Sequence, residues 1–133
     1  MPQFEDAQAQ RAQARFIRQS MAQPLLSRDR EYHLARSWRE DGNADSLQEL
    51  IRAYTRLVVS LASKFRNYGL PMSDLIQEGT LGLLQAASRF EPERNVRFST
   101  YATWWIRASI QDYILRNWSI VRGGTSSTQK ALF

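Results

Sequence analysis

Apolar residues recur along this chain at the three- and four-residue spacing of a helix. The clearest run contains Leu47, Leu50, Ile51, Tyr54, Leu57, Val58, Leu61 and Phe65. No segment shows a convincing alternation of apolar and polar residues, which is the mark of a half-buried strand. We therefore expect an all-α fold, a compact bundle of several helices.

Residues that begin or end helices divide this pattern into segments. Pro24 ends a first helix over about residues 5–21. Ser27 has the side chain of an N-cap for a second helix, which Gly42 ends. Asp45, three residues before a glutamine, resembles a capping box at the start of a third helix.

The later segments follow the same rules. The third helix ends at residues 67–69, a fourth covers residues 73–90, and Ser99 caps a fifth that continues to about residue 117. A last helix opens at residue 126 or 127.

Charge is distributed unevenly along the 133 residues, a length that suits one domain with a real core. The net charge is +5, and residues 94–133 hold six basic side chains against the single acid Asp112, so the whole excess lies there. Such a concentration favours a polyanionic partner, although a solvated basic face would look the same.

The fifth predicted helix has two contrasting faces, because neighbouring residues lie about 100° apart around its axis. The core-facing stripe consists of Ala102, Ile106, Ile110, Tyr113 and Asn117. The opposite face consists of Tyr101, Trp104, Trp105, Ala108, Gln111 and Asp112, with Arg107 on the flank. Either a second layer of the protein covers these rings, or they bind a partner. Rings among arginines are typical of single-strand binding, where bases stack and cations hold phosphates.

Two signatures, DLIQEG and FSTYATWWIR, lie in the order and at the separation found in bacterial RNA polymerase sigma factors. From about residue 24 to the end, the chain strongly resembles domain 2 of the sigma-70 family, above all over LIQEGTLGLLQAASRFEPERNVRFSTYATWWIRASIQ. The tail YILRNWSIVRGGTSSTQKALF is most similar to the heat-shock branch, whose sequence box begins near residues 129–133.

The resemblance implies that this domain binds core polymerase and recognises the −10 promoter element as it melts. Trp104 and Trp105 would form the wedge that replaces the lost base pair at the upstream edge of the bubble. Tyr101 would stack on a flipped non-template adenine. The residues that match the capturing pocket are Phe90, Glu91, Arg94, Thr100 and Tyr101. Arg97 and Arg107 would neutralise phosphates, which makes binding salt-dependent.

The sequence departs from the housekeeping pattern at three positions. Housekeeping members read the duplex base pair at the upstream edge with a glutamine and a threonine, whereas this chain has Ala108 and Gln111 on the expected DNA-binding face. We therefore expect the consensus of an alternative sigma factor. Tyr54 stands where housekeeping members use an asparagine near a second flipped base, so that contact is not carried over.

The fourth predicted helix has a docking face. Its expected buried stripe consists of Ile76, Thr80, Leu83, Ala87 and Phe90, and its other side carries Asp74, Glu78, Leu81 and Gln85. An exposed leucine among acids and amides suits docking to a partner helix, and it is also common on a solvated face. The resemblance implies that this face, with Asp74, Gln77 and Glu78, clasps the coiled coil of the polymerase's largest subunit. Gly79 and Gly82 would permit that close approach or tight packing within the domain.

No catalytic or cofactor-binding pattern occurs in the sequence. His33 is the only histidine, there is no cysteine, and the glycines at 123–124 lack the lysine spacing of a phosphate loop. We expect no enzyme activity, no metal and no cofactor, with His33 on the surface of the second helix. The lack of a signal peptide and of a membrane-length apolar run predicts a cytoplasmic protein, and the resemblance implies that it is nucleoid-associated.

We expect three parts in the chain: a helical extension over residues 1–23, sigma domain 2 over 24–122, and the start of a linker over 123–133. Complete sigma factors add a helix-turn-helix domain for the −35 element, so we expect a piece of a longer protein that binds promoter DNA weakly by itself. The expected partners are core RNA polymerase and the −10 non-template strand. Chaperone, protease or anti-sigma regulators are further expectations. The alternative is a protein-only helical adaptor whose aromatic face docks another protein.

Overall fold

The computed structural model describes residues 2–22 and 25–122. Its elements are α1 (Pro2–Ala22), α2 (Arg28–Asp41), α3 (Ala44–Ser63), the short 3-10 helix η1 (Arg66–Tyr68), α4 (Met72–Arg89) and α5 (Phe98–Arg122). These residues contain no strand, so the predicted all-α fold is confirmed. The predicted last helix, the predicted linker over residues 123–133 and the tail sequence box lie outside the described residues.

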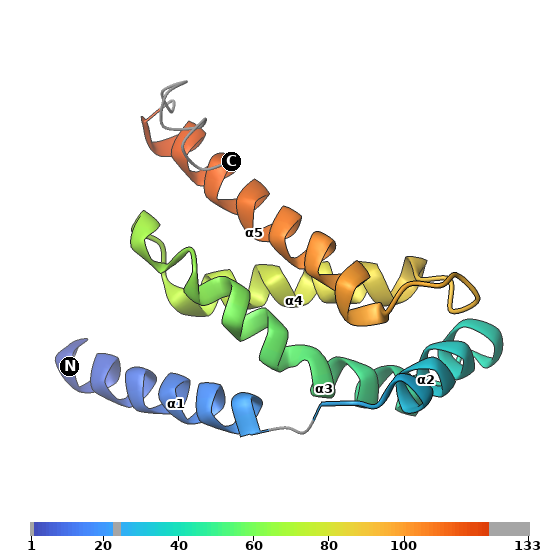
Figure 1. Ribbon diagram of the computed structural model, residues 1–133. Helices are drawn as coiled ribbons and strands as arrows, with labels where there is room; N and C mark the ends of the chain where they lie inside the picture. The colour runs from blue at the N-terminus through green and yellow to red at the C-terminus, as the bar shows by residue number, and fades with distance from the viewer. Residues whose placement is uncertain (1, 23–24, 123–133) are drawn as a thin grey trace.

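The helices are arranged around α3, which α1, α2, α4 and α5 all contact. In Figure 1, α5 runs back along α4. The connection between them, residues 90–97, lies beside α2. This places a segment from the first third of the chain against the end of α5 that carries the tyrosine and the tryptophan pair.

Local signals set most of the helix ends. The Ser27 side chain accepts a hydrogen bond from the Arg30 amide (3.1 Å), and Gly42 ends α2 in the left-handed conformation, with φ of 64°. Both agree with the prediction. The predicted capping box at Asp45 is wrong: Asn43 is the N-cap of α3 and accepts from the Ser46 amide at 3.1 Å. An asparagine in the extended conformation two residues earlier meets the same need for an acceptor.

The core is continuous through α2, α3, α4 and α5. Its fully buried side chains include Leu50, Val58, Leu75, Leu83, Phe98, Ile106, Ile110 and Ile114. The predicted stripe of α5 is confirmed at Ala102, Ile106 and Ile110, while Tyr113 and Asn117 are only half-buried. In the predicted stripe of α4, Thr80 is only half-buried, and its hydroxyl donates to the Ile76 carbonyl (2.8 Å), whereas Leu75, which was not predicted, is fully buried.

Gly82 marks the closest approach of α4 and α5. A Cβ atom there would lie 2.5 Å from the Trp105 carbonyl oxygen and 2.9 Å from the Ile106 Cα atom. A Cβ atom at Gly79 would meet side-chain ends instead, at 2.8 Å from Val58. Of the two explanations for these helix-weakening glycines, the structure supports tight packing within the domain.

Candidate nucleic-acid interface

Five of the predicted DNA-binding residues lie along one outer ridge of α5. They are Thr100, Trp104, Arg107, Ala108 and Gln111, whose helical spacing places them on one side of the helix. We call this set the α5 ridge. Trp104 is its most prominent member, with 76% of its surface exposed. Exposing a large indole to water is unfavourable, so an uncovered ring of this size is typical of a surface that binds a partner.

A hollow lies at the N-terminal end of the α5 ridge. Its volume is about 190 Å³, and it is lined by Arg89, Phe90, Glu91, Arg94, Val96 and Tyr101. We call it the base hollow. It includes four of the five residues predicted to capture a flipped base, while Thr100 lies on the exposed side of α5 beside Tyr101. A single purine ring fits within this volume.

Aromatic rings connect the base hollow to the core. Neighbouring ring centroids are 5.5 Å apart for Tyr54 and Phe98, 5.2 Å for Phe98 and Phe90, and 5.5 Å for Phe90 and Tyr101. Phe90 is buried and forms the inner wall of the hollow. Because the inner rings are fixed by core packing, the exposed side of Tyr101 is held ready for stacking before any ligand arrives.

The prediction that three large aromatic side chains of α5 project outward is wrong in part. Only Trp104 is exposed, whereas Tyr101 and Trp105 are half-buried and pack against the core. The reason is that residues 90–97 and the end of α4 reach around this side of α5, with Arg89 over the Trp105 ring at 5.1 Å from its centroid. The rings are nevertheless not sealed, because Tyr101 lines the open base hollow.

Charged groups of both signs stand at the rim of the base hollow. The Arg94 Nε atom lies 2.6 Å from a Glu91 carboxylate oxygen, and both side chains are largely exposed. A carboxylate accepts a hydrogen bond from the exocyclic amino group of adenine, while a guanidinium donates to ring nitrogens or phosphate. The rim can therefore recognise the edge of a base whose face stacks on Tyr101.

Arg97 points away from the base hollow, toward α2. Its Nε atom donates to Glu31 at 2.6 Å, and its Nη2 atom donates to the Leu26 carbonyl at 3.3 Å. The carboxylate of Glu31 raises the pKa of the Arg97 guanidinium through this hydrogen bond and its charge. Arg97 thus has a partner within the domain, and its predicted contact with phosphate stays a prediction.

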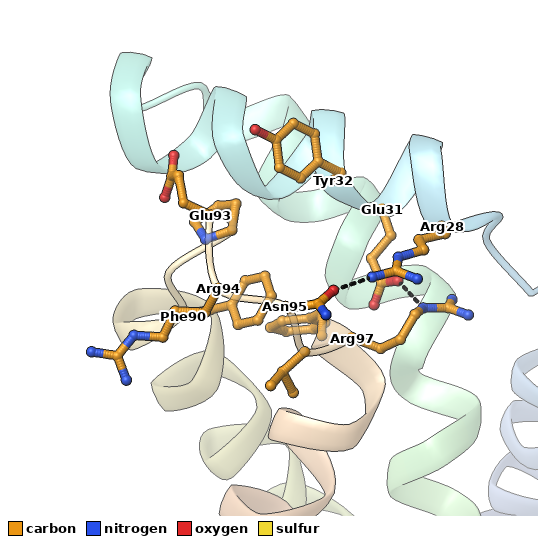
Figure 2. A pocket seen from close by; sticks show the side chains of 11 residues that line it. Arg28, Glu31, Tyr32, Phe90, Glu93, Arg94, Asn95 and Arg97 are labelled. Atoms are coloured by element: carbon orange, nitrogen blue, oxygen red, sulfur yellow. Dashed lines mark hydrogen bonds and ion pairs between the residues drawn. The ribbon is translucent and has the colours of Figure 1, made fainter.

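Glu31 also supplies the N-terminal cap of α5. Its side chain is 3% exposed, and its second oxygen accepts from the Ser99 amide at 3.0 Å. The cap that was predicted from Ser99 itself therefore comes from a residue 68 positions earlier. A negative charge at this position also complements the helix dipole. The turn of α2 that carries Glu31 adds a hydrogen bond from Arg28 to Asn95 at 2.8 Å, which fixes the segment before α5 (Figure 2).

A second hollow, of about 410 Å³, opens between α2 and residues 90–98. Figure 2 shows Glu31 and Arg97 paired on one side of it, with Tyr32 and Glu93 above and Arg94 pointing outward. Phe90 and Arg94 line both hollows. The short segment between α4 and α5 therefore shapes two recesses at once.

Tyr54 is buried directly behind this region. Among the described residues, its hydroxyl is the one buried side-chain polar atom without a hydrogen-bond partner. Burial, followed by the negative charge of Glu31, raises the pKa of Tyr54 to about 12. The ring belongs to the core, so the structure provides no contact from Tyr54 to a base.

The docking face predicted on α4 is exposed along one line of side chains. These are Gln77, Leu81, Leu84 and Gln85, which we call the α4 ridge; Leu81 is 51% and Leu84 38% exposed. The two acids predicted beside it are half-buried and paired with α5. Asp74 accepts a hydrogen bond from the Tyr113 hydroxyl at 2.9 Å, and Glu78 lies 3.8 Å from Arg116. Burial and the Asp74 hydrogen bond raise the pKa of Tyr113.

Sequence reasoning missed several residues of these surfaces. Arg89 and Val96 line the base hollow, and Leu84 extends the α4 ridge. Leu84 could have been predicted, because it lies three residues from Leu81 on the same helix. No neighbouring residue in the sequence indicates that Glu31 contacts Arg97 and Ser99. The predicted position of His33 on the surface of α2 agrees with the structure.

The described residues hold no group of three or more side chains able to bind a metal ion. No helix among them is long and apolar enough to span a bilayer.

Comparison with known proteins shows the family of this chain. The family model for sigma-70 region 2 matches residues 50–120, which is more than half of the 133 residues. The chain therefore belongs to the sigma-70 family, as the sequence signatures predicted.

Individual relatives carry the names of sigma factors. The chain is 46% identical over 120 residues to RNA polymerase sigma factor RpoH of Caulobacter vibrioides and 47% identical over 110 residues to that of Rhizobium radiobacter. It is 46% identical over 110 residues to RNA polymerase sigma-C factor of Myxococcus xanthus. These alignments cover 83–90% of this chain and 37–41% of the relatives. The chain thus spans about two fifths of the length of these relatives.

Proposed function

We propose that this chain directs RNA polymerase to promoters by holding bases of the −10 element in the single-stranded state. It acts by binding alone. A ligand that binds only the open strand shifts the equilibrium between duplex and open DNA, so no bond chemistry is required. The observation that carries the proposal is the open base hollow, lined by Phe90 and Tyr101, with the exposed Trp104 one turn further along α5.

The parts of the surface divide the work. The base hollow receives the flipped non-template adenine, with Tyr101 stacked on its face and Glu91 and Arg94 at its edge. Trp104 and the outer edge of Trp105 replace the lost base pair at the upstream end of the bubble. The α5 ridge continues this surface along the DNA, where Arg107 contacts phosphate.

The second partner is core RNA polymerase, bound through the α4 ridge. Leu81 and Leu84 supply apolar contact, and Gln77 and Gln85 supply hydrogen bonds to a partner helix. Asp74 and Glu78 border this surface and also hold α5, so docking on α4 is linked to the position of α5. Membership in the family and the names of the relatives support this choice of partner.

The tail resemblance and the relatives named RpoH support an alternative sigma factor of the heat-shock type. Ala108 and Gln111, which replace the glutamine and threonine of housekeeping members, point to a different upstream specificity. Within this proposal the protein acts in the cytoplasm, and its regulators include chaperones, proteases or an anti-sigma protein.

Binding to single-stranded DNA tests the proposal. The chain, assembled with core RNA polymerase, is titrated with a −10 non-template oligonucleotide and with a scrambled oligonucleotide of the same composition. We expect preference for the −10 sequence, and we expect Tyr101→Ala and Trp104→Ala each to weaken that binding about tenfold, the value of one stacked base. Phe16→Ala is the matched control, since Phe16 is an exposed ring on α1. Equal binding to both oligonucleotides, with no effect of either α5 change, would favour the protein-only adaptor.

A further inference from the structure

Arg89 is shared by the base hollow and the tryptophan pair. It is the last residue of α4, it lines the hollow beside Phe90 and Tyr101, and its guanidinium lies 5.1 Å from the centroid of the Trp105 ring. The described residues contain two other contacts of this kind, Arg36 over Tyr32 and Arg116 over Tyr113. Each of those joins neighbours on one helix, whereas the Arg89 contact joins α4 to α5.

The backbone that carries Arg89 is fixed by α2. The last carbonyl groups of α4 accept side-chain hydrogen bonds: Ala87 from the indole of Trp38 at 3.2 Å, and Ser88 from Arg39 at 2.6 Å. These groups would otherwise lack partners at the helix end. The backbone position of Arg89 is therefore set by α2, and its exposed side chain places the guanidinium over the Trp105 ring.

A guanidinium over the face of an indole is attracted by the negative face of the ring and restricts its rotation. Trp105 also packs near Tyr101, with ring centroids 6.4 Å apart. The ring thus lies next to both a cation from α4 and the tyrosine that lines the base hollow. Trp104, its neighbour in the chain, has no such restraint and is exposed.

We propose that Arg89 is a positioning residue, which fixes Trp105 and thereby joins the base hollow and the tryptophan pair into one preformed surface. The inference rests on the proposed function. Without Arg89, the Trp105 ring must be ordered when DNA binds, and the entropy lost then weakens binding. Arg89 acts through Trp105 and not through a phosphate.

A double-mutant cycle tests this role. The chain is assembled with core RNA polymerase, and binding of the −10 non-template oligonucleotide is measured for the wild type, Arg89→Gln, Trp105→Leu and the double variant. Leucine keeps an apolar side chain at position 105 but has no ring face for a cation. We expect Arg89→Gln to weaken binding about fivefold in the wild-type background and less than about twofold in the Trp105→Leu background. An equal loss in both backgrounds would overturn the proposal.

Two comparisons separate positioning from simple loss of charge. Arg89→Lys keeps a cation over the ring and should bind within about twofold of the wild type. Arg36→Gln removes the same charge and the same kind of contact on α2, and it should leave binding unchanged. Loss of a phosphate contact would reduce the dependence of binding on salt by about one ion, whereas loss of positioning leaves that dependence unaltered. A reduced salt dependence in Arg89→Gln would therefore contradict the inference.

A measurement without DNA keeps the inference separate from the proposed function. The indole N–H resonance of Trp105, assigned with Trp105→Phe, should shift and broaden in Arg89→Gln and stay in place in Arg36→Gln. An unchanged resonance would overturn the role of Arg89. If instead the wild type fails to prefer the −10 oligonucleotide, the proposed function fails, whatever the resonance shows.

Discussion

The outward surfaces of α4 and α5 differ in how much of each also belongs to the core. On α5, Tyr101 and Trp105 pack inward and line or border the candidate base site, and only the α5 ridge is free. On α4, the α4 ridge makes no part of the core, while the opposite side of the helix holds Leu75, Leu83 and the two glycines. The surface on α5 therefore includes side chains that also pack in the core, whereas the α4 ridge consists of side chains that lie outside the core.

This difference has a physical consequence for binding. A surface anchored in the core is rigid, so little entropy is lost when a flat ligand such as a base is placed on it. The α4 ridge consists of long amide and leucine side chains, which adapt to a partner helix. Substitutions near the base hollow should therefore alter stability and DNA binding together, whereas substitutions on the α4 ridge should alter partner binding alone.

The largest effect on stability is expected where the two helices touch. Gly82→Ala should lower the free energy of unfolding by about 3 kcal/mol, because the new Cβ atom meets the backbone of α5 and the helices must separate. Gly79→Ala should cost less, about 1 to 2 kcal/mol, because its new Cβ atom meets a methyl group of the buried Val58 rather than backbone, and alanine favours the helix. Urea denaturation measures both. Similar values for the two variants would contradict the close crossing at Gly82.

The buried cap comes next. Glu31→Gln should destabilise the protein by about 2 kcal/mol, because a charged hydrogen bond to Arg97 is lost within a buried site and Arg97 keeps partial access to water. Glu49→Gln is the matched control: it breaks the exposed pair with Arg30 and should cost less than about 1 kcal/mol. The same denaturation measurements compare them. If Glu31→Gln costs no more than Glu49→Gln, the contacts of Glu31 with Arg97 and Ser99 do not hold α5 in place.

Tyr54 gives a pH-dependent effect of similar or smaller size. Its pKa in the folded protein is about 12, above the ordinary value of 10.0, so the folded chain keeps a proton that the unfolded chain releases. The free energy of unfolding is therefore unaffected by this group below pH 10, and it falls as the pH rises toward 12 because only the unfolded chain releases the proton. The wild type should lose about 2 kcal/mol more than Tyr54→Phe over this range. Parallel curves for the two proteins would show that Tyr54 titrates normally.

At neutral pH, the free energy of unfolding of Tyr54→Phe should equal that of the wild type or exceed it by up to about 1 kcal/mol. The change removes a buried hydroxyl that lies near Glu31 and Arg97 but makes no hydrogen bond to either. Thermal or urea denaturation decides this point, and a large loss of stability would mean that the hydroxyl has a partner in solution.

The smallest effect on stability is expected on the α4 ridge. Leu81→Glu should change the free energy of unfolding by less than about 0.5 kcal/mol, because the side chain is half exposed and lies outside the core. The same change should weaken binding to core polymerase at least tenfold through the loss of an apolar contact and the burial of a charge. Pull-down or interferometry with core polymerase measures the binding. Unfolding caused by this change would contradict the contrast between the two surfaces.

The sequence allowed the local features of the fold to be predicted, because each depended on residues close together in the chain. Ser27 begins α2 and Gly42 ends it, as expected. The helical spacing also predicted that Ala102, Ile106 and Ile110 of α5 are buried. The capping box failed because two acceptors, Asn43 and Asp45, stand close together and sequence alone does not rank them. The extension of α5 to Arg122 was also missed, although the sequence permitted it, because no glycine or proline occurs between Asn117 and that residue.

The candidate site was predictable in composition and less so in arrangement. Spacing correctly placed Trp104 on the outer side of α5, but it could not show that Arg89 and residues 90–97 cover part of Trp105 and Tyr101. The pairing of Glu31 with Arg97 joins residues 66 positions apart, and no local pattern indicates it. Contacts of this kind depend on how α2 packs against the connection between α4 and α5.

The most direct test concerns the base hollow itself. The chain is assembled with core polymerase, and its binding to two −10 non-template oligonucleotides is compared. One carries the flipped adenine, and the other carries an abasic site in its place. The wild type should favour the adenine about tenfold, and Tyr101→Ala should bind the two oligonucleotides equally, because the stacking partner of the base is gone. A wild-type protein that binds both equally, or a Tyr101→Ala protein that keeps the full preference, would show that no base is held against Tyr101 in the base hollow.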